Sequence, residues 1–250
     1  MKFCTLSDLH CLPDRLDLQE VLKNFLRNPI VQDCQAIFFL GDIFDVMVGD
    51  HNEYLNIYSF FFKELEILAK RGVAIHYFEG NHDFHIKKLF KNFSKKIGVK
   101  NITVHSDHLL KVIDGKKIYF SHGDDIEIGK LKYKSYKLFI KSLPLNFVAD
   151  YCVPYEVLDF MGNFASQNSK KRNHIRYSDP EFCEEVRSIF RCSASRAWKK
   201  HHFDYLICGH AHIADIWKSP DGFTYANAGA CFLVNQFIVY EKGKIEIVKF

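Results

Sequence analysis

The segment Ala36–Asp45, AIFFLGDIFD, sets the architecture that the rest of the chain follows. Residues 36–40 form a continuous apolar run that ends at Gly41, which predicts a buried strand followed by a sharp turn. Asp42 therefore stands just beyond the carboxyl end of a strand. Because burying a lone carboxylate is costly, we expect Asp42 to bind cations, and its two oxygens could bridge two of them. An ordinary Gly-Asp turn is the alternative.

Four further apolar runs end in side chains of the same kind. The runs FCTL, AIHYF, KIYFS and YLIC precede Asp8-Leu9-His10, Gly80-Asn81-His82-Asp83, His122-Gly123 and Gly209-His210-Ala211-His212. In α/β proteins, ligands bind outside the carboxyl ends of the strands. Each motif alone could be a turn, but five in order, each closing a strand, indicate one shared site.

The residue types at these strand ends favour metal ions. Carboxylates combined with neutral imidazoles, without a thiolate, suit Mn, Fe, Zn or a similar divalent ion. Asp8 and His10 are two residues apart, as are His210 and His212, and in extended backbone this spacing places both side chains on one side. Two such ions about 3.5–4 Å apart can hold both ends of an in-line phosphoryl displacement.

The first hundred residues predict a parallel sheet. Strands are expected at Lys2–Leu6, Ala36–Leu40 and Val73–Phe78, and they alternate with amphipathic helices at Leu16–Leu26 and Tyr54–Arg71. This alternation of strands and helices is typical of a mixed α/β (α+β) fold with connected parallel strands.

Beyond residue 102 the pattern changes to short strands. Those expected are Thr103–Val104, then Leu109–Ile113 and Lys117–Ser121 around an Asp114-Gly115 turn, and then Tyr205–Cys208, Gly222–Ala228, Cys231–Tyr240 and Lys244–Val248. Lys130–Arg191 has a helical pattern without strand signals. We therefore predict a single domain, residues 1–250, that carries a helical insertion, or lid, at about 130–191.

The composition indicates a globular protein without a membrane span. Hydrophobic residues make up 48% of the 250 residues and charged residues 26%, and the net charge of +4 is too small to indicate nucleic-acid binding. No apolar run reaches the roughly 18 residues of a membrane span, and the N-terminus lacks the apolar stretch of a signal peptide. The eight cysteines are scattered, which favours reduced thiols in the cytoplasm.

The insertion carries most of the positive charge. Residues 130–176 contain nine Lys or Arg against three Asp or Glu, a net charge of +6. Tyr133, Tyr136, Phe139 and Phe147 lie among the lysines. A solvated helix face would explain the charge alone. The interleaved aromatic residues favour an anionic ligand or the surface of an anionic membrane.

The full set of motifs, D-x-H, G-D-x-x-D, G-N-H-D, H and G-H-x-H, resembles the calcineurin-like metallophosphoesterases from Asp8 to His212. The resemblance implies a four-layer sandwich of two mixed β-sheets flanked by helices. It also implies two divalent metal ions, most simply Mn²⁺, with Fe or Zn as alternatives.

The resemblance also implies a role for each residue. The ligands of one ion would be Asp8, His10, Asp42 and His212, and those of the other Asp42, Asn81, His122 and His210. Asp42 would bridge the two ions. His82 would contact the phosphate and assist the leaving group, and Asp45 would orient that histidine.

Within the family, the chain resembles the UDP-2,3-diacylglucosamine hydrolases of lipid A synthesis. The segment GDIFDVMVGD, residues 41–50, fits them and lacks the Arg-Gly that follows this motif in protein phosphatases. The segment NSKKRNHIR, residues 168–176, resembles their substrate-binding stretch. The chain departs from them in having His82, Lys130 and Arg176 where those enzymes more often have Arg, an acid and Lys. The implied substrate-binding residues are Asn81, His82, Tyr133, Ser169, Asn173, Arg176 and His210.

The sequence therefore predicts a metal-dependent hydrolase of a phosphoric ester or pyrophosphate. The expected reaction cleaves the diphosphate of UDP-2,3-diacylglucosamine to UMP and 2,3-diacylglucosamine 1-phosphate, in the cytoplasm at the inner face of the cell membrane. The expected partners are this nucleotide-linked lipid and the membrane surface, not nucleic acid. The alternatives are a phosphoesterase for another nucleotide or phospholipid, and a metal-free interaction scaffold, which the intact ligand set disfavours.

Overall fold

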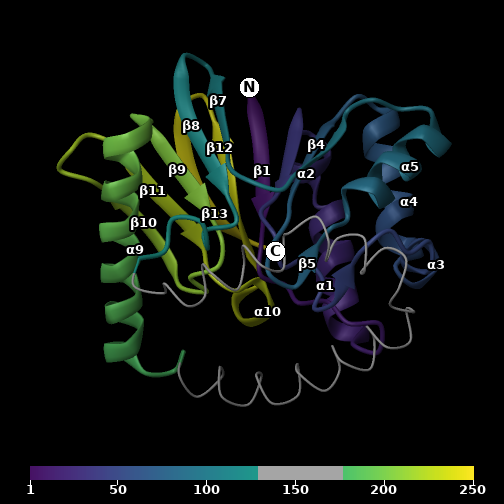
Figure 1. Ribbon diagram of the computed structural model, residues 1–250, viewed down its shortest axis with the longest axis horizontal. Coiled ribbons are helices and arrows are strands. Elements are labelled where there is room, and N and C mark those ends of the chain that lie inside the picture. The colour runs from purple at the N-terminus through teal and green to yellow at the C-terminus, as the bar shows by residue number, and fades with distance from the viewer. Residues whose placement is uncertain (129–176) are drawn as a thin grey trace.

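The computed structural model describes residues 1–128 and 177–250. Two β-sheets pack face to face in the middle of the molecule, and helices cover their outer faces (Figure 1). The order of layers is helix, sheet, sheet, helix, so the predicted mixed α/β sandwich is confirmed.

The first sheet contains the strands that the N-terminal pattern predicted. Its order is β13-β12-β1-β2-β4-β6. These strands are β1 (Lys2–Leu6), β2 (Ala36–Phe39), β4 (Ala74–Phe78), β6 (Ile102–His105), β12 (Gln236–Glu241) and β13 (Lys244–Lys249). Strands β1, β2, β4 and β6 are parallel, whereas β12 is antiparallel to both β1 and β13. The parallel strands bring the ends of β1, β2 and β4 to one edge of the sheet.

The second sheet supplies the other two motif-bearing strands. Its members, in spatial order, are β10 (Ala214–Lys218), β11 (Thr224–Ala228), β9 (Tyr205–Cys208), β8 (Lys116–Ser121) and β7 (Leu109–Ile113). Strands β8, β9 and β11 are parallel. The β7–β8 hairpin turns at Asp114 and Gly115, whose φ angles of 51° and 74° suit the predicted two-residue turn.

Helices cover the outer faces of both sheets. α1 (Leu16–Arg27), α4 (Ser59–Lys70) and α5 (Lys87–Ile97) pack on the first sheet, and α9 (Pro180–His201) packs on the second. The short elements are α2 (Pro29–Gln32), α3 (Glu53–Ile57), α10 (Cys231–Val234), β3 (Met47–Val48) and β5 (Asp83–Phe84).

The core between the sheets follows from the alternation of side chains along the strands. In β2, Ala36 and Phe38 face the second sheet, whereas Ile37 and Phe39 face the helices. The rings of Phe38 and Phe120, one from each sheet, stack with centroids 4.1 Å apart. Both side chains are fully buried, so this contact fixes how the two sheets, and the strand ends they carry, lie against each other.

The prediction of one helix over Tyr54–Arg71 is wrong, because two helices, α3 and α4, meet at Tyr58. Tyr58 leaves the helical conformation (φ −103°, ψ 36°). Its buried ring packs against that of Phe44, with the ring centroids 4.2 Å apart. Its hydroxyl donates to the carbonyl oxygen of Cys11. Tertiary packing of this tyrosine outweighs the local helical pattern.

The predicted strand Cys231–Tyr240 is wrong in its first half. Residues 231–234 form α10, Asn235 takes a left-handed conformation (φ 47°), and β12 begins at Gln236. The backbone N–H of Phe232 donates to the carbonyl oxygen of Asp8, so the apolar stretch turns toward the end of β1 before it joins the sheet.

The predicted insertion overlaps the core at its C-terminal end. Helix α9 extends past position 191 to His201, and Phe190 and Ala194 pack on the second sheet. Residues 129–176 lie outside the described part of the chain. Among residues 1–128 and 177–250, no helix has the length and apolar character needed to cross a membrane.

Candidate metal centre

The five strand ends meet where the two sheets adjoin. The loops after β1, β2 and β4 come from the first sheet, and those after β8 and β9 come from the second. In the described part of the chain, the side chains gather into groups that could hold a metal ion. These groups are Asp8, His10 and His212; Asp42, His122 and His210; and His10, Asp45 and His82.

The first group surrounds one candidate ion position. Asp8 Oδ1 lies 3.2 Å from His212 Nε2, and His10 Nε2 lies 3.9 Å from Asp42 Oδ2. Ligand atoms about 2.1 Å from a shared ion lie about 3.0–3.4 Å apart in octahedral or tetrahedral geometry. His10 Nε2 is buried and has no hydrogen-bond partner among residues 1–128 and 177–250. An unpaired buried nitrogen facing carboxylates fits a metal ligand.

The second group surrounds a neighbouring position. His122 Nε2 lies 3.1 Å from Asn81 Oδ1, 3.2 Å from His210 Nδ1 and 3.5 Å from Asp42 Oδ2. The same Asp42 oxygen therefore faces a histidine of each group, as a bridging ligand requires. Six of the seven predicted metal ligands make up the two groups, and the seventh, Asn81, adjoins the second. The six are Asp8, His10, Asp42, His122, His210 and His212.

Hydrogen bonding around His122 tests whether these residues suit a cation. His122 Nδ1 lies 2.8 Å from the carbonyl oxygen of Leu40, so this nitrogen carries the proton and donates it. In the neutral ring, Nε2 then presents a lone pair to Asn81 Oδ1 and Asp42 Oδ2, which are both acceptors. Three acceptors that face one another need either a proton or a cation between them, and the residues therefore fit a metal ion.

The charges in the cluster compensate one another. Burial raises the pKa of the Asp42 carboxyl, but the imidazoles of His122, His82 and His10 outweigh this and hold it well below its usual range. Burial lowers the pKa of His122, but the charges of Asp42 and the other nearby carboxylates raise it to about 10. A proton on His122 therefore occupies the place that a metal ion would take.

Asp42 also connects three loops through hydrogen bonds. Its Oδ1 accepts from the backbone N–H groups of Asn81 and His82, both at 2.9 Å. Its backbone carbonyl accepts from Leu9 and His10 at 2.9 and 3.0 Å. The residue is 1% exposed. One carboxylate oxygen is thus fully engaged with backbone donors, which leaves the other oxygen to face both metal positions.

Asp45 contacts His82 differently from what the sequence suggested. His82 Nδ1 donates to the backbone carbonyl oxygen of Asp45 at 2.9 Å, while the Asp45 carboxylate lies 3.6 Å away. That carboxylate is nearer to His10, with Asp45 Oδ1 3.1 Å from His10 Nδ1. Both histidines therefore use Nδ1 as a donor, so the third group is a hydrogen-bonded network around Asp45 and not a third metal position.

Asp83 belongs to the G-N-H-D motif, but no role for it was predicted. It is fully buried, and burial together with the charge of Asp42 raises the pKa of its carboxyl to about 7. It joins the loop after β2 to the loop after β4, because its oxygens accept from the N–H groups of Asp42, Ile43, Phe44 and Gly80 and from the hydroxyl of Tyr77.

Close packing explains two glycines of the motifs. Gly41 has a φ of 83°, and a Cβ there would lie 2.6 Å from His122 Nδ1. A Cβ at Gly80 would clash with Asp42 Oδ1 and lie 2.6 Å from the Asp42 backbone nitrogen. Glycine is therefore required for the loops after β2 and β4 to approach the cluster.

Four of the predicted substrate-binding residues fall in the part of the chain that is not described. They are Tyr133, Ser169, Asn173 and Arg176. The other three, Asn81, His82 and His210, lie in or beside the metal cluster. The His82 side chain is 33% exposed, so it stands at the rim where a substrate can reach it.

The fold and this cluster define a metal-dependent phosphoester hydrolase. A family model described as Calcineurin-like phosphoesterase matches residues 1–214. The chain belongs to the calcineurin-like phosphoesterase family.

Similar proteins support the same assignment. The UDP-2,3-diacylglucosamine hydrolase of Aliivibrio fischeri (strain MJ11) is 26% identical over 86% of this chain and 83% of its own length. The enzyme of the same name from Neisseria meningitidis serogroup B (strain ATCC BAA-335 / MC58) is 27% identical over 88% of this chain and 85% of its own length. A solved structure described as a novel archaeal phosphodiesterase covers 100% of both chains at 18% identity with a TM-score of 0.50, which supports the fold alone.

The protonation of His122 predicts that metal binding releases protons. At neutral pH, below its pKa of about 10, a proton must leave His122 before Nε2 can bind an ion. Titration of the metal-free protein with Mn²⁺ should therefore give calorimetric heats that depend on the ionisation enthalpy of the buffer. Affinity should rise with pH toward 10.

The same pKa determines how the stability of the metal-free protein changes with pH. The folded pKa lies above the ordinary value of 6.5, so charged His122 stabilises the metal-free fold below about pH 6.5, and this contribution is lost as the pH rises through about 10.

The calorimetric prediction has a clear contrary outcome. Equal heats of Mn²⁺ binding in phosphate and Tris buffers would contradict the displacement of a proton from His122.

Proposed function

We propose that this chain hydrolyses the diphosphate bond of UDP-2,3-diacylglucosamine to UMP and 2,3-diacylglucosamine 1-phosphate. The observation that carries the proposal is the pair of ligand sets that share Asp42 Oδ2, since a two-ion site suits phosphoryl transfer. The substrate is inferred from the relatives of that name, which align over 86–88% of this chain.

The candidate ligands would hold two divalent ions. One would be held by Asp8, His10, Asp42 and His212, and the other by Asp42, Asn81, His122 and His210. Carboxylate, imidazole and amide donors without a thiolate suit Mn²⁺, and also Fe or Zn. When bound, the ions supply positive charge that activates water and neutralises the phosphoryl oxygens.

His82 is proposed as the group that assists the leaving phosphate. Its Nδ1 is occupied by the Asp45 carbonyl, so Nε2 is the nitrogen that can meet the substrate. Burial lowers the pKa of His82, but the nearby charges of Asp42 and Asp45 outweigh this and raise it above its ordinary value. His82 is therefore suited to donate a proton or a hydrogen bond to a phosphoryl oxygen.

The rim of the cluster offers apolar surface to acyl chains. The Phe232 ring lies edge-on to those of His10 and His212, with centroids 5.7 and 5.8 Å away. Leu233 is half-buried and Val234 is 38% exposed. Phe232 places an apolar ring beside the polar site, and the next two residues of α10 are also apolar, which supports a substrate with both a phosphate and a hydrocarbon part.

The substrate assignment predicts a strong preference for acylated sugars. We expect kcat/KM for UDP-2,3-diacylglucosamine to exceed that for UDP-N-acetylglucosamine by at least about a hundredfold, because each buried methylene contributes about 0.8 kcal/mol. Release of UMP from both compounds, and of nucleoside monophosphate from a cyclic nucleotide, gives the comparison. Equal values for the two sugars, or a preference for the cyclic nucleotide, would exclude the lipid substrate and leave the phosphoesterase activity.

The role of His82 predicts a large kinetic effect without metal loss. We expect His82→Ala to lower kcat on UDP-2,3-diacylglucosamine by about 10²–10⁴-fold, since general acid groups contribute about that much. Metal content, measured by plasma emission, should stay at the wild-type level. His202→Ala removes an exposed imidazole at the end of α9 and serves as the control. A His82→Ala enzyme with wild-type kcat on this substrate would refute the role.

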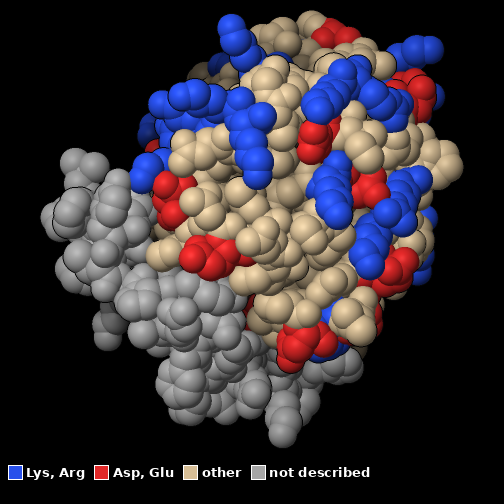
Figure 2. Space-filling model, turned by 90° about the vertical axis from the view of Figure 1, so that its right-hand side faces the viewer, with Lys and Arg blue, Asp and Glu red and all other residues tan. Residues whose placement is uncertain are grey.

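Because the proposed substrate is a lipid, we expect the protein to act at an anionic membrane surface on the cytoplasmic side. Figure 2 views the molecule from the side of α3, α4 and α5, where Lys and Arg side chains are widely spread. α5 contributes five exposed lysines and no acidic residue: Lys87, Lys88, Lys91, Lys95 and Lys96. Each lysine near an anionic surface contributes about 1 kcal/mol, so this helix supports peripheral attachment.

Peripheral attachment predicts binding that depends on charge. The protein should sediment with vesicles that contain phosphatidylglycerol, and high salt should release it. A Lys91→Gln/Lys95→Gln double variant should bind more weakly by about tenfold or more. The control is Lys242→Gln/Lys244→Gln at the β12–β13 turn. Equal loss in both double variants would show that only net charge matters, and no sedimentation of the wild type would exclude attachment.

A further inference from the structure

We propose that Glu127 is a positioning residue that fixes the ring of His210 for metal binding. The inference rests on the proposed metal centre. No role was predicted for Glu127, because a single acid five residues after His122 forms no recognisable motif. Its importance follows from where the loop after β8 places the side chain.

The contact joins the half-buried ring of His210 to a buried carboxylate. Glu127 Oε2 lies 3.2 Å from His210 Nε2, and Glu127 is 6% exposed. On the other side of the ring, His210 Nδ1 faces His122 Nε2 at 3.2 Å, inside the second candidate group. A carboxylate accepts hydrogen bonds, so Nε2 carries the proton and Nδ1 keeps its lone pair for an ion.

Two other histidines of the cluster, His10 and His122, have comparable acceptors. His10 Nδ1 donates to the Asp45 carboxylate, and His122 Nδ1 donates to the carbonyl oxygen of Leu40. The carboxylate of Glu127 thus does for the second group what Asp45 does for the first. Because a charged acceptor raises the basicity of a histidine ligand more than a neutral carbonyl does, Glu127 should strengthen the bond from His210 to its ion.

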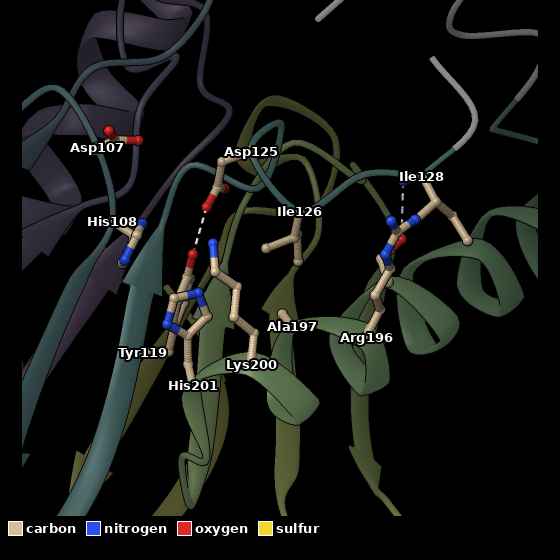
Figure 3. Close-up of a pocket in the computed structure, with 11 residues that line it drawn as sticks. Asp107, His108, Tyr119, Asp125, Ile126, Ile128, Arg196, Ala197, Lys200 and His201 are labelled. Carbon is tan, nitrogen blue, oxygen red and sulfur yellow. Dashed lines mark hydrogen bonds between the residues drawn. The ribbon is translucent and has the colours of Figure 1, made fainter. Parts of the chain in front are cut away.

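The loop that carries Glu127 is held on both flanks. The Tyr119 hydroxyl donates to Asp125 Oδ2 at 2.7 Å, and the backbone N–H of Ile128 donates to Ser193 Oγ of α9 at 3.3 Å. Figure 3 shows Asp125, Ile126 and Ile128 along one side of a pocket of about 530 Å³ whose opposite side is α9. These neighbours line that pocket, while Glu127 contacts His210.

Helix α9 also contacts the histidine itself. The ring centroids of Phe190 and His210 lie 6.3 Å apart. His210 is therefore fixed by an aromatic neighbour and by a carboxylate on a loop that α9 holds in place. Placement of this kind selects one tautomer and one ring orientation before an ion arrives.

The test compares metal affinity in Glu127→Ala, Glu127→Gln and Asp125→Asn. Binding of Mn²⁺ is measured by calorimetry, with the number of ions checked by plasma emission. Glu127→Ala should weaken one of the two ions by about 10–100-fold and leave the other unchanged. Glu127→Gln keeps an acceptor oxygen but loses the charge, so its loss should be intermediate. Asp125→Asn removes the same charge from the loop but keeps an oxygen that can accept from the Tyr119 hydroxyl, so the loop stays in place and both affinities should remain near wild type.

The outcomes separate the role of Glu127 from the stability of the fold and from the existence of the metal centre. Unchanged affinity for both ions in Glu127→Ala would overturn the positioning role. An equal loss in Asp125→Asn would also overturn it, because the effect would then come from loop charge or loop order. Equal melting temperatures for the three variants exclude a general loss of the fold. A wild-type protein that binds no second ion would instead refute the proposed metal centre itself.

Discussion

The buried carboxylate of Asp42 is the constraint on which the rest of the centre depends. One oxygen is held by the backbone N–H groups of Asn81 and His82, and the other faces both His10 and His122. A charge at 1% exposure is tolerable only when donors and cations surround it. The loops after β1, β2 and β4 and the end of β8 are all arranged to provide them.

This arrangement also strains the backbone. Five of the seven candidate ligands adopt left-handed φ angles between 51° and 67°: Asp8, His10, Asp42, His210 and His212. Non-glycine residues pay about 1 kcal/mol or more for this conformation, and it persists only where the surroundings enforce it. Here the Asp83 carboxylate, with its five donors, enforces the shape of two loops. A metal centre of this kind is therefore preorganised by the protein.

The two sheets each contribute some of the candidate ligands of the metal centre. Asp42 and Asn81 come from the first sheet and His122 and His210 from the second, so their separation depends on the inter-sheet core. The stacked rings of Phe38 and Phe120 lie in that core. α9 acts from the outer layer through the loop after β8. Packing in the core between the sheets, away from the candidate ligands, thus sets the distances between the groups that would bind the ions.

The sequence by itself determined the parallel strands, the five strand ends and the ligand types, because apolar runs closed by Gly, Asp and His are local patterns. It also determined the family. Only the tertiary structure decided that Tyr58 divides a helix, that the Asp45 carboxylate serves His10 more closely than His82, and that Glu127 meets His210. These features depend on contacts between residues 35 to 83 positions apart, or on the packing of a single ring, and no local pattern encodes them.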